Sequence, residues 1–400
     1  MLSGIAILGA GIFAKEGHLP ALADLGEAAP NLKAVYSRSE KNAHEFADAA
    51  AAALNGTTPA IYHDGDKAND LDALLARSDI AAVIVALPIT LQPSFVLKAL
   101  AAGKHVLSEK PVAPDVAQGL ELIKTYNSQY KSKGLVWRIA ENFEAEPGFR
   151  AAAAAIAEGK IGRVIFFRTV VYNYIDEDSK WYKTPWRTVP DVRQSFSSIP
   201  ICIENTFQTT QLDGEFPQHT IAALRVMLPH QLTHLSGFAS LNKDFLGPHD
   251  TINVVARAGS HFHGTAEITF ASPTKSRPVA DGFVITGTDG WLSVNQVGAE
   301  RFRGPIFRVT IKSVVKKEGK PDEEVEEVIE EPVKGIQAEL ASFFIAAEVA
   351  SFFNAVKGKS DGTDLGDPLS ALRDVAFIEA ALNSDGRLVD LAELVPASLS

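Results

Sequence analysis

The chain has 400 residues, of which 46% are hydrophobic and 22% charged, so it is neither disordered nor collagen-like and is long enough for two or more domains. Its 38 lysines and arginines against 49 aspartates and glutamates give a net charge of −11, which argues against binding to nucleic acid. A single cysteine, Cys202, excludes an internal disulfide framework and any multi-cysteine metal site.

The apolar runs are too short for a membrane protein. The run 81–88 is among the longest, and it falls far short of the ~20 residues that cross a bilayer. The first apolar stretch lacks a basic flank and breaks at Gly9, so we expect no signal peptide. With the single cysteine, these features predict a cytoplasmic protein without membrane or nucleic-acid partners.

Residues 1–143 alternate between short apolar runs and helical patterns. We expect strands at 4–8, 32–36, 81–87, 105–108 and 135–140, and helices at 12–25, 40–54, 71–76, 92–102 and 114–129. Strands that alternate with helices indicate a parallel sheet, because parallel neighbours need long connections. The continuous apolar character of the strands predicts helices on both faces, and therefore an α/β domain with a doubly wound sheet.

The pattern changes in residues 144–400. After a helix at 148–157 we expect strands at 163–174, 251–258, 262–270, 282–287, 291–295, 307–315 and 325–330, and closing helices at 336–356 and 368–382. Several of these strands alternate apolar with polar residues, which is typical of an antiparallel sheet with one solvated face. This region therefore predicts an α+β domain with one large, mostly antiparallel sheet.

The expected helix at 336–356 contains two near copies of a nine-residue sequence, 338–346 and 347–355. Nine residues make two and a half helical turns, so the two copies point in opposite directions. We expect the apolar face of one copy to pack while that of the other is poorly placed.

Residues 9–14 (GAGIFA) form a GxGxxA motif between the first strand and the first helix. The glycines allow a tight turn and a close approach of the backbone to a pyrophosphate at the positive end of the helix. With the strand–helix alternation that follows, the motif predicts a dinucleotide site.

The end of the second strand reads YSRS at 36–39, where an NAD site would place a carboxylate. The first carboxylate is Glu40, whereas Ser37 and Ser39 can donate hydrogen bonds. Arg38 can pair with a 2′-phosphate or stack on adenine, although an ordinary exposed loop arginine is the alternative. We therefore expect NADP(H), with NAD(H) as the less favoured cofactor.

Residues 108–111 (SEKP) follow the strand at 105–108, at the edge of a parallel sheet where ligands bind. Lys110 can reach a nicotinamide or a substrate oxygen there; an ordinary surface lysine is the alternative. The histidine pairs His230 and His234, and His261 and His263, have no carboxylate or cysteine partner at ligand spacing, so we expect no metal.

The GAGIFA motif, HLP at 18–20, EKP at 109–111 and AEN at 140–142 together resemble the Gfo/Idh/MocA family of oxidoreductases. KTPWR at 183–187 resembles a fungal NADP-dependent branch of that family. The resemblance implies a Rossmann domain over 1–143 and a substrate domain over 144–400 whose open-faced sheet often forms dimers. It also implies NAD(P)-linked hydride transfer on a small-molecule substrate, which would be a sugar, a polyol or a small carbonyl compound. We expect a homodimer through the C-terminal sheet.

By this resemblance Lys110 lies near the nicotinamide and hydrogen-bonds the reacting oxygen, and Glu141 and Asn142 lie near the nicotinamide end. The residues that we expect to bind the dinucleotide are Gly9, Gly11, Ile12, Phe13, Ser37, Arg38, Leu87, Pro88, Glu109, Lys110, Glu141, Asn142, Trp186 and Arg187.

The family also carries a segment GGxxxDxGxH, whose Asp and His bind substrate and move the proton. In this sequence Asp213 and His219 are the counterparts, but the glycine pair is missing and the spacing is six instead of four. We take Lys110, Asp213 and His219 as candidate catalytic residues.

The polar, patternless segment 192–211 lies just upstream, where the family has no counterpart. It is either a genuine surface loop or translated non-coding sequence. The altered segment leaves an alternative function open, a catalytically impaired dinucleotide-binding regulator on the same scaffold.

Overall fold

The computed structural model describes residue 2 and residues 4–178, 217–278, 281–299, 304–316, 321–353 and 365–396, with the backbone alone at 299 and 348–353. The chain forms two compact units, Met1–Asn142 with Gly335–Leu372 and Phe143–Lys334 with Arg373–Ser398. The segment 192–211 and the candidate residues Trp186, Arg187 and Asp213 lie outside the described residues.

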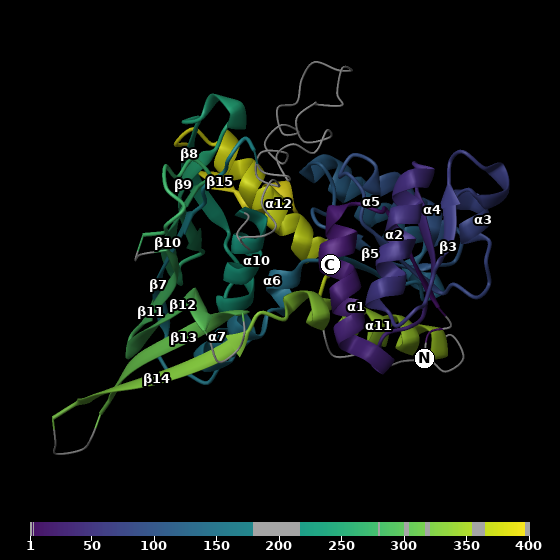
Figure 1. The fold of residues 1–400 in the computed structure, drawn as a ribbon. Coiled ribbons are helices and arrows are strands. Elements are labelled where there is room, and N and C mark those ends of the chain that lie inside the picture. The colour runs from purple at the N-terminus through teal and green to yellow at the C-terminus, as the bar shows by residue number, and fades with distance from the viewer. Residues whose placement is uncertain are drawn as a thin grey trace. The chain divides into compact units, whose positions relative to one another are not determined.

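The first unit, of which β3 and β5 are labelled in Figure 1, is built on a six-stranded parallel sheet with the order β3-β2-β1-β4-β5-β6. Its strands are β1 (Ile5–Leu8), β2 (Leu32–Ser37), β3 (Ala60–His63), β4 (Ala82–Val85), β5 (His105–Glu109) and β6 (Trp137–Ala140). This order is that of a doubly wound dinucleotide-binding sheet and confirms the predicted fold. The strand order reverses between β1 and β4, and sheets of this kind bind ligands at the carboxyl ends of the strands at such a reversal.

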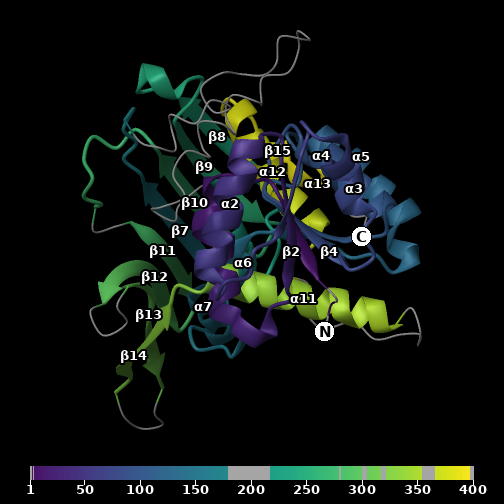
Figure 2. The ribbon, with the colours of Figure 1, turned by 45° about the vertical axis from the view of Figure 1, so that its right-hand side comes forward.

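Helices cover this sheet on both faces (Figure 2). They are the π-helical η1 (Ala14–His18), α1 (Leu19–Leu25), α2 (Glu40–Ala53), α3 (Leu71–Leu75), α4 (Gln92–Ala101), α5 (Val116–Gln129) and α11 (Gly335–Phe353). Leu22 of α1, Phe46 of α2 and Phe343 of α11 pack in one core cluster with Ile7 and Ile84 of the sheet. Although α11 follows the second sheet in sequence, it belongs to the core of the first unit.

Side-chain caps fix where several helices begin. The Ser39 side chain accepts a hydrogen bond from the backbone N–H of Asn42 at the start of α2. Asp115 accepts one from Gln118 at 2.8 Å, so α5 begins at Val116 and not at the expected 114. The strand β3 was not expected, because it is a four-residue, half-exposed edge strand whose apolar pattern is too short to stand out.

The second unit contains a nine-stranded sheet with the order β14-β13-β12-β11-β7-β10-β9-β8-β15. Its strands are β7 (Val164–Tyr172), β8 (His234–Ser240), β9 (Thr251–Ala258), β10 (Phe262–Thr269), β11 (Gly282–Gly287), β12 (Gly290–Ala299), β13 (Gly304–Val315), β14 (Glu323–Pro332) and β15 (Val389–Asp390). Every neighbouring pair is antiparallel except β7 and β10, which confirms the predicted, mostly antiparallel sheet.

Helices cover one face of this sheet. They are α7 (Pro147–Ala157), α10 (Pro217–Met227) and α12 (Pro368–Asn383), preceded by the short α6 (Asn142–Ala145) and followed by α13 (Leu391–Leu394). Phe149 of α7, Leu224 of α10 and Phe377 of α12 pack against Phe167 and Ile285 of the sheet. On β9, β10 and β11 buried and more exposed side chains alternate, so the opposite face carries no such layer among the described residues.

The strand β8 is the second correction to the expected elements. Its sequence HLSGFAS is rich in small and polar residues and did not read as a strand. A Cβ at Gly237 would lie 2.8 Å from the carbonyl oxygen of Asn253, so the close approach of β8 to β9 requires the glycine. None of the helices in the described ranges is both long and apolar enough to span a membrane.

Candidate functional site

The glycine-rich turn follows β1 directly. Gly9 has a φ of +113°, and its N–H donates to the carbonyl oxygen of Tyr36 at 2.8 Å. A Cβ at Gly9 would overlap the carbonyl oxygen of Ala86 beyond β4, so only glycine fits this crossing. A Cβ at Gly11, by contrast, would meet nothing within 4 Å. The outer side of the turn is therefore open, as a backbone that receives a pyrophosphate must be.

A π-helical segment, η1, joins this turn to α1. Phe13 precedes it, and the Phe13 ring meets the His18 ring edge-on with 5.0 Å between the ring centroids. A Cβ at Gly17 would lie 2.6 Å from the Phe13 ring, so the small residue lets the ring lie flat on this turn. The His18 side chain is fully buried, and its Nε2 lies 2.8 Å from Oε1 of Glu109 at the end of β5. Segments of π-helix are frequent at functional sites.

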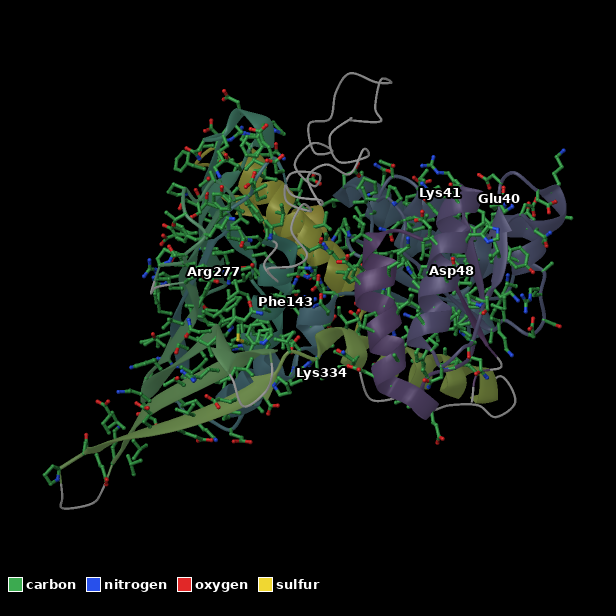
Figure 3. All side chains as sticks on the ribbon, in the orientation of Figure 1. Glu40, Lys41, Asp48, Phe143, Arg277 and Lys334 are labelled. Atoms are coloured by element: carbon green, nitrogen blue, oxygen red, sulfur yellow. The ribbon has the colours of Figure 1, made fainter. Side chains whose placement is uncertain are left out.

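The end of β2 presents an arginine beside a helix N-terminus. Ser37 is buried and closes the strand, and its Oγ accepts a hydrogen bond from the N–H of Ser39 at 3.4 Å. Arg38 is exposed between them. Glu40 and Lys41 follow on the first turn of α2 (Figure 3). An exposed guanidinium at the positive end of a 14-residue helix is suited to an anion.

The strand before this arginine is tied to its neighbour β3. The Tyr36 hydroxyl donates to Oδ1 of Asp64, the residue after β3, at 2.5 Å. Burial, followed by this hydrogen bond, raises the pKa of Tyr36 well above its usual 10. The hydroxyl therefore stays protonated, and one carboxylate oxygen of Asp64 is occupied as the acceptor of its hydrogen bond.

The end of β5 is buried throughout. Ser108, Glu109 and Lys110 are each at most 8% exposed, and the Trp137 Nε1–H donates to the Ser108 hydroxyl at 3.0 Å. The peptide bond between Lys110 and Pro111 is cis. The hydrogen bond from Trp137 of β6 to Ser108 fixes the end of β5, which is followed by Lys110.

Most of the expected dinucleotide-binding residues lie at one edge of the sheet. Gly9, Arg38, Leu87, Lys110 and Glu141 follow β1, β2, β4, β5 and β6, and parallel strands bring their carboxyl ends together. In the order β2-β1-β4-β5-β6, the arginine stands at one end, the glycine turn in the middle and the lysine towards the other end. Glu141 is buried at 2% exposure.

The candidate catalytic residue His219 lies in the other unit, on α10. It is 4% exposed, and its ring stacks on that of Phe143 with 4.7 Å between centroids and 21° between planes. Lys110 belongs to the first unit and His219 to the second, and Asp213 lies outside the described residues. The catalytic roles of Asp213 and His219 stay predictions.

The second unit holds a buried ion network that the sequence analysis did not identify. Arg225 donates to both carboxylate oxygens of Asp374, at 3.0 and 2.9 Å, and to Oε1 of Glu144 at 3.2 Å. Burial by itself would lower the pKa of Arg225, but the charges of Asp374 and Glu144 outweigh it and raise the pKa. The sequence signal that could have identified this network is Arg225 itself, a charged residue within the apolar helix α10. Such a residue needs a charged partner when it is buried.

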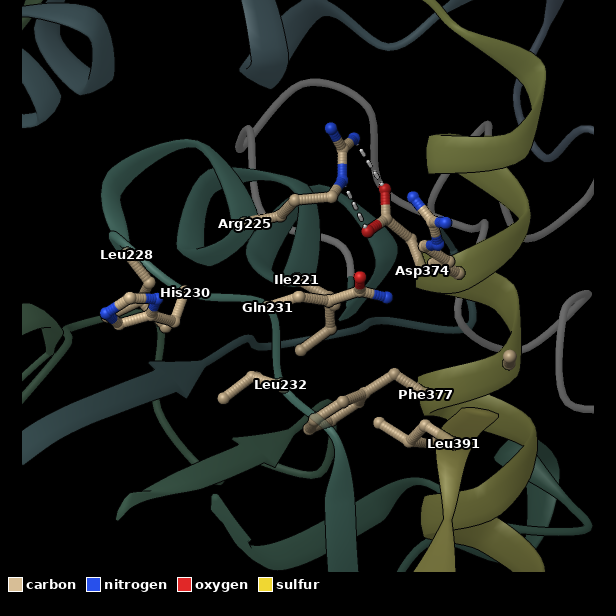
Figure 4. A pocket seen from close by; sticks show the side chains of 11 residues that line it. Ile221, Arg225, Leu228, His230, Gln231, Leu232, Asp374, Phe377 and Leu391 are labelled. Carbon is tan, nitrogen blue, oxygen red and sulfur yellow. Dashed lines mark hydrogen bonds and ion pairs between the residues drawn. The ribbon is translucent and has the colours of Figure 1, made fainter. Parts of the chain in front are cut away.

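A pocket adjoins this network. Figure 4 shows Arg225 and Asp374 on one side of it and Leu232, Phe377 and Leu391 on the other. Across the described part of the chain, no three His, Cys, Asp or Glu side chains gather where they could hold a metal ion. His230 stacks instead on His261 with 3.9 Å between the ring centroids.

Comparison with known proteins agrees with this fold. The family described as an oxidoreductase family with an NAD-binding Rossmann fold, Gfo/Idh/MocA, matches residues 3–133. The dehydrogenase FPY6 of Fusarium mangiferae is 35% identical over 390 residues, which cover 95% of this chain and 96% of that protein. The levoglucosan dehydrogenase of Pseudarthrobacter phenanthrenivorans is 26% identical over 57% of this chain and 58% of its own length.

A solved structure is similar over the whole fold. The crystal structure of an oxidoreductase from Thermotoga maritima has a TM-score of 0.71 and 28% identity, and covers 98% of this chain and 99% of its own. Both units described above therefore have a counterpart of known architecture.

Proposed function

The chain belongs to the Gfo/Idh/MocA family of oxidoreductases, and from this premise we propose that it transfers a hydride between NADP(H) and a sugar, polyol or small carbonyl compound. A nicotinamide dinucleotide is the cofactor of the family domain that matches residues 3–133. The observation that carries the choice of NADP(H) is the exposed Arg38 after β2. No carboxylate lies between the end of this strand and Glu40. A carboxylate there would accept a hydrogen bond from the ribose 2′-hydroxyl of NAD, whereas a guanidinium pairs with a 2′-phosphate.

The residues of the first unit fit such a cofactor. The turn at Gly9 and Gly11 is open on its outer side and precedes a helix, which suits a pyrophosphate. Arg38 stands on the β2 side of this turn, and Glu109, Lys110, Glu141 and Asn142 follow strands on its other side. We propose that these residues hold the two ends of the dinucleotide, together with the other expected residues at the same edge.

Lys110 is the group that we propose acts on the substrate oxygen. The bound cofactor supplies or accepts the hydride. An ammonium group at the end of β5 donates a hydrogen bond to a carbonyl oxygen and stabilises the negative charge that develops there as the hydride arrives. We propose that His219, with Asp213, binds the substrate and takes part in the proton transfer.

The proposed substrate class follows from the relatives and the lysine. Levoglucosan, after which one relative is named, is a sugar derivative, and Lys110 needs only a hydroxyl or carbonyl oxygen to act on. A panel of sugars, polyols and aldehydes, followed by NADPH absorbance at 340 nm, tests this class.

The choice of cofactor is tested by calorimetric titration with NADPH and NADH. We expect the wild-type protein to bind NADPH more tightly, and Arg38→Ala to lose most of the difference. A hydrogen bond to a charged group is worth roughly 1.5–3 kcal/mol, or about one to two orders of magnitude in affinity. Arg257→Ala, which removes an exposed arginine from β9 of the other unit, is the control and should leave both affinities unchanged. Tighter binding of NADH by the wild type would contradict the proposal.

The alternative function, a dinucleotide-binding regulator with impaired catalysis, is favoured by one observation. His219 is buried in a ring stack with Phe143. Both functions require NADPH binding, but only the enzyme oxidises NADPH in the presence of a carbonyl substrate. Tight NADPH binding without turnover across the panel would therefore favour the regulator.

A further inference from the structure

A buried pair of side chains joins the two halves of the proposed cofactor site. Nε2 of His18, at the end of η1, lies 2.8 Å from Oε1 of Glu109, at the end of β5, although 91 residues separate them in sequence. The His18 side chain has no exposed surface, and Glu109 is 8% exposed. Glu109 directly precedes Lys110, so the hydrogen bond reaches the backbone that carries the proposed catalytic lysine.

The direction of this hydrogen bond follows from its chemistry. An ionised carboxylate can only accept, so Nε2 of His18 is the donor. The other ring nitrogen, Nδ1, is buried and has no hydrogen-bond partner among the described residues. The ring therefore has one polar anchor, Glu109, and one aromatic neighbour, Phe13, which belongs to the glycine-rich motif.

We infer that His18 is a positioning residue, which holds Glu109 and through it the Lys110 strand end in register with the glycine-rich turn. The inference rests on the proposed function, because it concerns the nicotinamide side of that same site. Phe13 and Glu109 are both expected to contact the dinucleotide, and His18 is the side chain that touches both. Without it, the carboxylate of Glu109 loses its donor and can turn to another partner.

The test separates the two ends of the cofactor. Calorimetric titration compares NADPH with adenosine 2′,5′-bisphosphate, which carries the adenine, ribose and 2′-phosphate but no nicotinamide. If the wild type prefers NADH, the matched pair of ligands is NADH and ADP instead. The key variant is His18→Phe, which keeps a ring against Phe13 and removes the donor to Glu109. The rescue variant is His18→Gln, which restores an N–H donor.

We expect His18→Phe to weaken NADPH binding by roughly ten- to a hundredfold, the value of one hydrogen bond to a charged group. Affinity for adenosine 2′,5′-bisphosphate should stay within about twofold, because Arg38 and the glycine turn are intact. His18→Gln should recover most of the lost affinity. His44→Phe is the matched control, since His44 pairs with Glu40 at 3.9 Å on the exposed face of α2.

Equal weakening of both ligands would overturn the inference, because it is the result of a purely structural role. Unchanged NADPH affinity in His18→Phe would overturn it as well. If His18→Phe does not fold, His18→Asn carries the same expectation, since its side chain is too short to reach Glu109. A wild-type protein that binds neither dinucleotide would instead overturn the proposed function, so the two failures are distinguishable.

Discussion

His105 occupies the first position of β5, where its imidazole is 5% exposed. Its Nδ1 accepts a hydrogen bond from the backbone N–H of Val136 at 3.1 Å. An acceptor nitrogen must be unprotonated, and burial lowers the pKa of His105 from 6.5 to about 4. The neutral ring is thus part of how β5 joins the segment that leads into β6.

This histidine gives the first unit a specific dependence on pH. In the folded protein the pKa of His105 lies below its value in the unfolded chain. Between pH 6.5 and about 4 the unfolded chain therefore binds more protons than the folded one. The contribution of the neutral His105 to the free energy of unfolding is therefore full above pH 6.5 and is lost as the pH falls to about 4. The gap between 6.5 and about 4 corresponds to roughly 3 kcal/mol. Urea unfolding at pH 7.0 and pH 4.5 measures it.

The variant His105→Asn isolates this effect from the carboxylates, which also titrate in this range. Asparagine keeps an acceptor oxygen for the N–H of Val136 but does not take up a proton. We expect the free energy of unfolding to fall less steeply with acid in the variant than in the wild type. Parallel pH profiles for the two proteins would contradict the account of His105.

At the scale of the element, α11 shows how one face of a helix is selected. Leu340, Phe343 and Phe344 of the first near copy, 338–346, are buried in the core of the first unit. Ile345, one position further on, is 57% exposed. Side chains of the second copy from 348 onwards lie outside the described residues. In the described part of the helix, the packed face therefore contains these three residues and Ala347, the first residue of the second copy.

This difference predicts opposite outcomes for neighbouring substitutions. Phe343→Ala removes a ring that is 1% exposed, and we expect a loss of about 3–5 kcal/mol in the free energy of unfolding. Ile345→Ala should change it by less than about 0.5 kcal/mol, since exposed positions rarely contribute more. Urea denaturation followed by circular dichroism measures both. A comparable loss for Ile345→Ala would show that the other face of α11 is the packed one.

At the scale of the whole molecule, the open face of the nine-stranded sheet is a feature that the proposed reaction does not explain. Residues paired directly in neighbouring strands share a face, and Val255, Thr265, Arg168 and Val284 form one such row across β9, β10, β7 and β11. Val255 is 55% exposed and Val284 36%. The other large exposed apolar residues on this face are Phe238, Trp291, Val314 and Val328. Such a patch marks an interaction surface.

We propose that a second copy of this chain covers the open face, because two-fold dimers are the commonest assembly of soluble proteins. Light scattering at micromolar concentration should give twice the mass of one chain, 42.9 kDa. The double variant Val255→Lys with Val284→Lys should be monomeric, because four lysines would meet across the two-fold axis. Leu388→Lys, at a residue 63% exposed outside the strands, is the control and should remain dimeric. A monomeric wild type would refute the proposal.

Local pattern alone predicted the helix–strand alternation, the parallel sheet and the glycine turn. The sites at the strand ends followed, because parallel strands necessarily bring their carboxyl ends to one edge. Arg38 and Lys110 could be placed at that edge from sequence, since each lies two residues after the end of an expected strand. The functional assignment of these residues, and the division into domains at 143/144, stay predictions.

Tertiary structure alone decided which distant segments meet. The edge strand β3 and the small-residue strand β8 have weak patterns of their own, and pairing with β2 and β9 makes them strands. The place of α11 in the core of the first unit, and the pairs His18–Glu109 and Arg225–Asp374, join residues 91 or more positions apart. No periodicity within a segment encodes such contacts, because burial and partnership depend on the packing of whole elements, and a buried charge finds its partner only when the chain has folded.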